Sequence, residues 1–264
     1  MKGGLDVSES NTRRRIWKAI FIICLAIFAA MLVLLLLHFF PVSQPIVSSP
    51  PAVSTPVTQT TEPTVILPDN PIDFAAQWEQ NPDIVAWMKI PGTVIDYPIL
   101  QSGNDVPENF YLNHAPDRSS RRAGSLYIQQ INLPDFTNPN TVIYGHNMAN
   151  GSMFAALKKY RQKEFFDQNQ YIYVYTPGHI LTYQIFSAFV YDDRHILNSF
   201  NFLDSEEYGA FLQQCLNPTS MVQQVRDGVS ITTDDRIITL STCTGRDTER
   251  YLVEGVLIND QPTN

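Results

Sequence analysis

One uninterrupted hydrophobic run dominates the N-terminal part of the chain. Residues 19–37 read AIFIICLAIFAAMLVLLLL, which is 19 positions without a charge. At about 1.5 Å per residue, such a helix spans close to the roughly 30 Å core of a bilayer. Three arginines and a lysine directly precede the run, whereas the next charge after it is Glu62. We expect a cytoplasmic N-terminus (residues 1–18), a retained membrane anchor (19–40) and an extracellular remainder. A cleaved signal peptide is the alternative, but its apolar part is usually only about 7–15 residues long.

The segment after the anchor, residues 41–71, is rich in Pro, Ser, Thr and Val. Such a composition cannot build a packed core, and its prolines favour an extended backbone. We therefore expect a spacer of 31 residues that separates the anchor from one folded domain, residues 72–264.

Within that domain the apolar residues indicate mostly strands with a few helices. Helices are predicted at 72–80 and 82–88, with two more at 153–160 and Ser205–Leu216. In the last of these, apolar side chains recur at i, i+3, i+4, i+7 and i+8. Runs rich in Val, Ile, Tyr, Phe and Thr, bounded by Gly, Pro, Asn or Asp, predict strands. The expected strands are 93–97, 125–128, 141–144, 171–176, 180–191, 236–242 and 251–258. The pattern favours a mostly antiparallel barrel or sandwich with peripheral helices.

Composition and charge narrow the class of protein. Hydrophobic residues make up 44% of the chain, which excludes a wholly disordered protein, and three cysteines exclude a scaffold built on disulfides. Five of the 18 basic and two of the 26 acidic residues precede position 41, so the outer part carries a net charge of −11. An acidic domain does not favour a nucleic-acid partner, because binding phosphates needs a basic face.

Of the three cysteines, Cys243 is the candidate for chemistry. It ends the strand predicted at 236–242 and opens a polar loop, and reactive groups at strand ends reach solvent. Cys24 lies in the hydrophobic run, and Cys215 lies on the apolar stripe of its helix, which predicts a structural role. Two alternatives stay open for Cys243: a plain buried cysteine, or a disulfide with Cys215 in an oxidising compartment.

Arg250 and His146 also lie at the ends of predicted strands, as Cys243 does. If the strands around the polar loop pair as a hairpin, Arg250 is the cross-strand neighbour of Cys243, where a guanidinium can favour a thiolate or bind an oxyanion. His146 follows the strand 141–144 after a glycine, so it is a candidate acid or base for a cysteine nucleophile. His179 lies in a predicted turn and His195 in a polar stretch, and both are expected to be exposed. No metal-ligand spacing is apparent.

These pieces together resemble the class B sortases, cysteine transpeptidases of Gram-positive cell surfaces. Residues 239–243 (TLSTC) are similar to the family's active-site strand, and residues 144–148 (YGHNM) to its histidine motif. Residues 150–154, 81–90 and 93–99 also resemble class B segments. The resemblance extends over about residues 72–260. It implies a closed antiparallel β-barrel with N-terminal helices and a helix inserted between late strands, here Ser205–Leu216.

The resemblance also implies roles for particular residues. Cys243 would be the nucleophile, His146 the acid and base, and Arg250 the group that binds the oxyanion, with Arg246 as the competing arginine. Three residues are weaker substrate-binding candidates: Asn113, Ser241 and Thr242.

The implied reaction joins two partners and needs no cofactor. The enzyme would cleave a C-terminal sorting signal of secreted proteins and pass the acyl group to an amine, either of a peptidoglycan cross-bridge or of a pilin lysine. The sequence leaves two alternatives: a hydrolytic cysteine protease with the same nucleophile, and a tethered β-sandwich adhesin without catalysis.

Overall fold

The structure is a computed structural model that describes residues 67–264 and, by itself, Met31. The chain divides into two units, residues 1–62 and 63–264, and the second contains nearly all of the described residues. The predicted cytoplasmic segment 1–18, the predicted anchor 19–40 apart from Met31, and most of the spacer lie outside the described residues. Within the described residues, no helix has both the length and the apolar character needed to cross a membrane.

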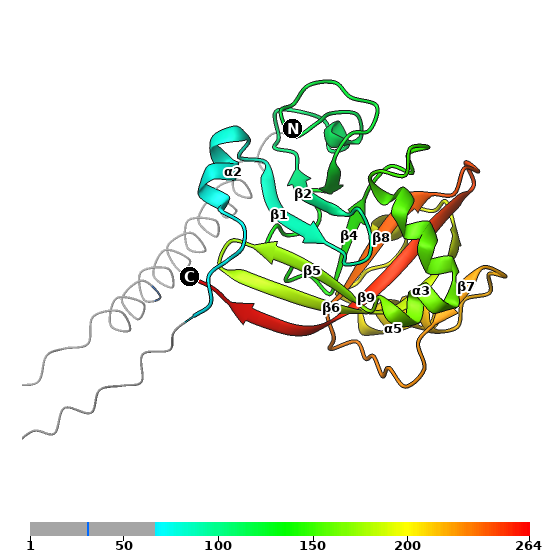
Figure 1. Cartoon of the computed structure of the whole chain (residues 1–264). Coiled ribbons are helices and arrows are strands. Elements are labelled where there is room, and N and C mark those ends of the chain that lie inside the picture. Colours follow the sequence, from blue (N-terminus) through cyan, green and yellow to red (C-terminus); the bar gives the residue numbers. More distant parts are fainter. Residues whose placement is uncertain (1–30, 32–66) are drawn as a thin grey trace, which may run out of the picture. The chain divides into compact units, whose positions relative to one another are not determined.

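Eight strands close into a barrel (Figure 1). The order around the barrel is β5–β1–β2–β3–β4–β8–β9–β6, and β6 pairs again with β5 to close it, while β7 adds to the free side of β6. The strands are β1 (Ile84–Lys89), β2 (Asp96–Gln101), β3 (Leu126–Ile128), β4 (Asn140–Tyr144), β5 (Tyr171–Thr176), β6 (His179–Asp192), β7 (Gln223–Val225), β8 (Ile237–Cys243) and β9 (Glu249–Pro262). The predicted closed barrel is thereby confirmed.

Six of the eight pairs around the barrel are antiparallel, as expected, and two are parallel: β2 with β3 and β4 with β8. Parallel neighbours need a long crossover connection, whereas antiparallel neighbours can be joined by a tight turn. In both parallel pairs a long stretch of chain separates the two strands. This departure from an all-antiparallel barrel matters for the site, because parallel strands end at the same edge.

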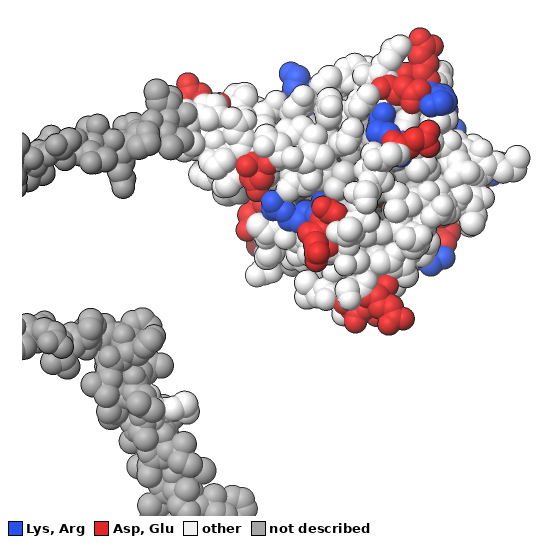
Figure 2. All heavy atoms as spheres, turned by 90° about the horizontal axis from the view of Figure 1, so that it is seen from below, with Lys and Arg blue, Asp and Glu red and all other residues white. Residues whose placement is uncertain are grey.

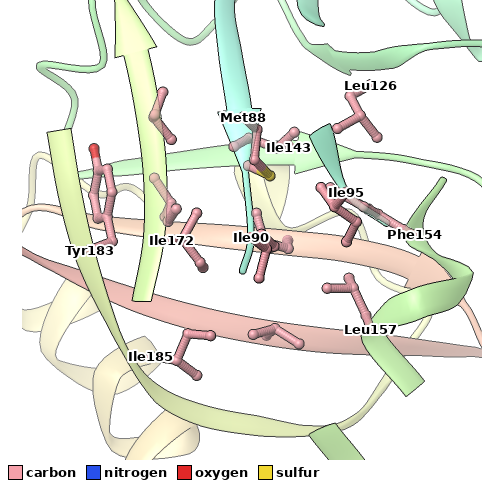
Figure 3. Close-up of a cluster of buried hydrophobic side chains, with 14 of the residues drawn as sticks. Met88, Ile90, Ile95, Leu126, Ile143, Phe154, Leu157, Ile172, Tyr183 and Ile185 are labelled. Carbon is pink, nitrogen blue, oxygen red and sulfur yellow. The ribbon is translucent and has the colours of Figure 1, made fainter. Parts of the chain in front are cut away.

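The barrel interior is filled by apolar side chains from nearly every strand. Figure 3 shows part of this core, in which Met88 and Ile90 near β1 meet Ile143, Ile172 and other residues from across the barrel. Each of these side chains is 1% exposed or less. Because successive strand residues point to opposite faces, the burial pattern of β1 alternates between buried and half-buried positions.

The helices lie outside the barrel. They are α2 (Phe74–Gln80), η1 (Phe110–Leu112), η2 (Phe154–Arg161), α3 (Lys163–Gln168), α4 (Ile196–Ser199) and α5 (Ser205–Leu216). The inserted helix α5 has the predicted bounds, and the Asp204 carboxylate caps it by accepting from the backbone N–H groups of Glu206 and Glu207. Its apolar stripe covers a second core on the outer face of β4, β6, β8 and β9.

One predicted helix is wrong: residues 82–88 contain strand β1, not a second N-terminal helix. Trp87 and Met88 pair with β2 on one side and with β5 on the other, so the segment is a central strand. Its β-branched and aromatic residues fit that environment, which overrides the weak helix signal of Pro82 and Asp83. The strand predicted at 93–97 begins later, at Asp96, because residues 91–95 form a turn. The predicted helix 153–160 is a 3₁₀ helix.

Charged side chains do not form one large patch on the face shown in Figure 2. There, acidic and basic groups of the described residues gather in small mixed clusters separated by uncharged surface. No continuous basic surface is visible on this face among the described residues.

Candidate active site

The parallel pairing of β4 and β8 brings the histidine and the cysteine to one edge of the barrel. Tyr144 at the end of β4 is in register with Ser241 of β8. His146 lies two residues after Tyr144, and Cys243 lies two residues after Ser241. Neighbouring strands are about 4.8 Å apart, so the register alone brings these two residues close, although 96 residues separate them along the chain.

Backbone and side-chain hydrogen bonds join the two segments beyond the last register pair. The Gly145 N–H donates to the Ser241 carbonyl (3.2 Å), and the Thr242 hydroxyl donates to the Gly145 carbonyl (2.7 Å). A Cβ at position 145 would lie 2.5 Å from a methyl carbon of Leu126 and 2.7 Å from the Phe154 ring. The glycine before the histidine is therefore required by close packing.

Arg250 faces the cysteine from the third strand. The antiparallel register of β8 and β9 pairs Cys243 directly with Arg250, as the hairpin interpretation predicted. The guanidinium Nη1 donates to the carbonyl oxygens of Asp247 and Glu249, at 3.0 Å each. These bonds use only part of its five donors, which leaves others for a substrate.

The competing arginine lies elsewhere. Arg246 is in the loop between the two strands, its side chain is 77% exposed, and it forms an ion pair of 2.8 Å with Glu249. It does not line the pocket that contains Cys243. The geometry therefore favours Arg250 over Arg246 as the partner of the cysteine.

Cys243, His146 and Arg250 line a single pocket of about 300 Å³. The other lining residues are Leu112, Tyr127, Tyr144, Gly145, Asp193, Arg194, His195, Ile196, Ser241 and Thr242. The rings of Tyr127 and Tyr144 stack with centroids 5.3 Å apart. Burial raises the pKa of Tyr127 to about 12 and raises the pKa of Tyr144 as well. Both phenols are thus uncharged at neutral pH, and this wall of the pocket is aromatic and neutral.

A single hydrogen bond orients the imidazole of His146. Its Nε2 lies 2.8 Å from the carbonyl oxygen of Leu112. Because a backbone carbonyl only accepts, Nε2 carries the proton in this contact. The other nitrogen, Nδ1, makes no hydrogen bond to any described residue. The ring is therefore held by one nitrogen while the other is available to take up or release a proton.

The two cysteines among the described residues, Cys215 and Cys243, are both free. Cys215 is fully buried under α5, whereas Cys243 is exposed at the end of its strand. The alternative of a disulfide between them is therefore wrong, and so is that of a plain buried Cys243. The structural role expected for Cys215 agrees with its burial.

The weaker candidates occupy different surroundings. Ser241 and Thr242 are buried residues that line the pocket. Asn113 is exposed and does not line it, although the preceding residue Leu112 does. No observation assigns any of the three to substrate, so their roles stay predictions.

His195 is the residue that sequence interpretation misplaced. It was expected to be exposed, yet it is half-buried, lines the pocket, and has its Nδ1 buried without a hydrogen-bond partner in the described part of the chain. Its ring centroid lies 6.4 Å from that of Tyr144. A histidine in a polar stretch carries no local signal of such a position, because the long strand β6 delivers it to the pocket. His179, at the other end of β6, is exposed as expected and contacts Asp260.

The described residues contain no cluster of three or more His, Cys, Asp or Glu side chains that could hold a metal ion. The polar groups that line the pocket with Cys243 include the imidazole of His146, the guanidinium of Arg250 and the hydroxyls of Ser241 and Thr242. That combination suits nucleophilic attack by sulfur on an acyl carbon, with an acid and base and an oxyanion partner nearby.

Comparison with known proteins supports the same chemistry. The family model for the Sortase domain matches residues 88–258. Sortase B of Listeria monocytogenes is 36% identical over 184 residues, which cover 67% of this chain and 71% of that protein. Sortase B of Staphylococcus aureus is 32% identical over 163 residues, which cover 62% of this chain and 64% of that protein.

Solved structures agree in fold. The structure of Clostridium perfringens sortase B matches with a TM-score of 0.62 and 31% identity, covering 71% of this chain and all of that one. A Staphylococcus aureus sortase B–substrate complex matches with a TM-score of 0.62 and 30% identity, covering 70% of this chain and 84% of that one. On the matched domain, the relatives and the shared fold, the chain belongs to the class B sortases and is a cysteine transpeptidase.

Proposed function

We propose that this enzyme cleaves a C-terminal sorting signal of secreted proteins and transfers the acyl group to an amine. One observation carries the proposal: Cys243, His146 and Arg250, which come from three strand ends, line the same pocket. The pocket is open to solvent at the exposed cysteine, so an extended peptide can reach the sulfur.

In the first half of the reaction, the Cys243 thiolate attacks the carbonyl carbon of the scissile peptide bond. Free donors of the Arg250 guanidinium bind the oxyanion of the tetrahedral intermediate. His146, in its protonated form, gives a proton to the departing amine, and the C–N bond breaks. The acyl group then remains on sulfur as a thioester.

In the second half, an incoming amine attacks the thioester and His146 removes a proton from it. The C–S bond breaks, a new amide forms, and the thiolate is regenerated. Splitting the reaction in this way keeps the acyl group activated, so no separate energy source is needed. Tyr127 and Tyr144 line the same pocket as the sulfur and give the substrates an uncharged aromatic surface to pack against.

The nature of the two partners follows from chemistry and from relatives. A solved sortase B structure is complexed with Gly3, and a triglycine presents an N-terminal amine. This supports an amine acceptor here, either a peptidoglycan cross-bridge or a pilin lysine. For the donor, we expect an NPxTx-type pentapeptide by resemblance to class B enzymes.

We further propose that residues 19–40 anchor the enzyme in the cell membrane, with the N-terminus in the cytoplasm and the catalytic domain outside. The uncharged run of 19 residues and the basic residues before it support this orientation. An enzyme that joins exported proteins to a cell-surface amine has both substrates on that side of the membrane.

A peptide-library assay tests the proposed reaction. The full chain, purified with detergent, is mixed with the library and with triglycine, and mass spectrometry follows the intact enzyme and the products. We expect a mass increase on Cys243 equal to the N-terminal part of the cleaved peptide, and a new amide to triglycine. Cleavage that yields only the free acid at saturating triglycine would favour the second candidate, a hydrolytic cysteine protease.

A further inference from the structure

The side chain of Asn147 reaches across from the histidine loop to the backbone of the catalytic strand. Its Nδ2 donates to the carbonyl oxygen of Cys243 at 2.7 Å. Asn147 is not among the residues that line the pocket around the cysteine. The bond instead joins the residue after His146 to the main chain of Cys243 itself.

This bond continues the sheet by one step after β4 has ended. In the parallel pair, the Gly145 N–H donates to the Ser241 carbonyl. In a parallel ladder the next equivalent bond comes two residues later on both strands. It would run from the backbone N–H of residue 147 to the Cys243 carbonyl. Here the side-chain amide of Asn147 makes that bond.

The backbone around Asn147 is committed elsewhere. Asn147 forms an isolated bridge with Met153, and the Phe154 N–H donates to the His146 carbonyl at 2.9 Å. Met153 adopts a left-handed backbone conformation with φ of 54°, which is uncommon for a residue other than glycine. The backbone on both sides of Asn147 is therefore paired within the loop itself, next to His146, which lines the pocket.

The contact with the Cys243 carbonyl requires a hydrogen-bond donor at position 147. A carbonyl oxygen only accepts, so the atom facing it must be a donor. The other atom of the same group, Asn147 Oδ1, is buried and has no hydrogen-bond partner among the described residues. A buried polar atom without a partner is unfavourable, and such exceptions to local rules concentrate at functional sites.

We propose that Asn147 is a positioning residue that holds Cys243 and His146 in a fixed relation. It replaces the ladder bond that β4 gives up when the chain turns to present His146, and so keeps the Cys243 backbone extended at the open end of β8. The proposal rests on the nucleophile and acid–base roles of Cys243 and His146. It predicts that losing the donor misaligns the pair without changing the substrate-lining surface.

The test compares N147D with N147A in the full chain, purified with detergent. The aspartate variant keeps the shape of the side chain but places carboxylate oxygens against the Cys243 carbonyl. If Asn147 acts as a donor, N147D is at least as impaired as N147A. If Asn147 only fills space, N147D stays close to wild type and N147A is the worse variant.

Two readouts separate positioning from general damage. With a peptide from the library assay, we expect kcat of N147D to fall about 10- to 100-fold while KM changes less than about threefold, because small misplacements of reacting groups cost rate rather than affinity. Without any peptide, alkylation of Cys243 by iodoacetamide is followed against pH. Loss of the aligned imidazolium should move the alkylation profile to higher pH in N147D.

Asn150 supplies a matched control in the same loop. Its Oδ1 accepts from the backbone N–H and the hydroxyl of Ser152, and among the described residues its side chain makes no hydrogen bond to β8. N150D should leave both kcat and the alkylation profile near wild type. Wild-type kcat and an unshifted profile in N147D would overturn the proposal for Asn147. Turnover by C243A in the same assay would instead overturn the underlying mechanism.

Discussion

The two described cysteines of this enzyme have the same side chain and opposite surroundings. Cys215 belongs to α5, and its side chain is fully buried against the outer face of the barrel. Burial together with the nearby Glu254 raises its pKa well above the ordinary value. Cys243 lies at the open end of β8, exposed, paired with Arg250 and lining one pocket with His146. A thiol becomes useful for catalysis only where the thiolate is stabilised and can be reached.

The two regions also use polar groups differently. Around Cys243, donors and acceptors are left free to meet a substrate, as in Arg250 and in the Nδ1 atom of His146. Under α5, the one carboxyl group of Glu254 is enclosed, accepts a hydrogen bond from the Thr239 hydroxyl at 2.7 Å, and has its other oxygen without a partner among the described residues. The polar groups around Cys243 can therefore meet a substrate, whereas the carboxyl group of Glu254 is enclosed by packed side chains.

Removing each sulfur should give the largest contrast between the regions. C243A should abolish the acyl-enzyme and reduce turnover at least about 10³-fold, because no other nucleophile in the pocket replaces the thiolate. C215A should keep near wild-type turnover and lose on the order of 1 kcal/mol of stability from a small cavity. Mass spectrometry of the acyl-enzyme and denaturant unfolding measure the two effects. Retained turnover in C243A, with the fold intact, would remove this cysteine from the mechanism.

The second largest difference is expected between substitutions of the two arginines near Cys243, Arg250 and Arg246. R250A should lower kcat/KM by about 10²–10³-fold if its guanidinium supplies an oxyanion donor. R246A removes only an exposed ion pair with Glu249 and should change kcat/KM by less than about threefold, because exposed pairs contribute little. Steady-state kinetics on one peptide rank the two variants. The reverse ranking would reassign the oxyanion role to Arg246.

The enclosed carboxyl of Glu254 should give the region under α5 its own pH signature. Burial raises its pKa from 4.5 to about 8. Between these values the unfolded chain has released the proton and the folded chain still holds it, so this group lowers stability as pH rises. From about pH 4.5 to pH 8 the loss amounts to roughly 3–5 kcal/mol. Denaturant unfolding of wild type and E254Q across this range measures it.

E254Q is the control for that pH dependence, because glutamine keeps the shape and cannot ionise. The stability difference between E254Q and wild type should grow in favour of E254Q as pH increases, and level off above about pH 8. A difference that stays constant across the range would show that Glu254 is not held protonated in the fold.

Local sequence patterns predicted many of the elements. The stripe of α5 and the β-branched runs of β4, β5, β6 and β8 gave strong periodic or compositional signals, and the structure has elements at those places. The helix predicted at residues 82–88 was wrong because a short segment can be a helix or a strand. Only its pairing with β2 and β5 made it a strand. Short elements such as β7, α3 and α4 were missed because three to six residues carry little periodicity.

The sequence also predicted candidate site residues and, of their arrangement, only the pairing of Cys243 with Arg250 across the hairpin. Cys243, His146 and Arg250 were recognised from strand ends and from motifs similar to class B sortases. His195 was not, because its polar stretch carries no local signal, and Asn147 was part of the histidine motif but carried no sign of its contact with Cys243. His195 reaches the pocket through the length of β6, and Asn147 reaches Cys243 because β4 stops one step before β8.

The sequence by itself determined which side chains can do the chemistry, since a thiol, an imidazole and a guanidinium are properties of single residues. It also determined a β-rich domain, since alternating burial follows from the side-chain period of a strand. Only the tertiary structure decided that these three groups share one pocket. The parallel pairing of β4 with β8 set that outcome, because it joins segments about a hundred residues apart and no local pattern encodes the register between them. The antiparallel pairing of β8 with β9 across a short loop adds Arg250, as the hairpin interpretation predicted.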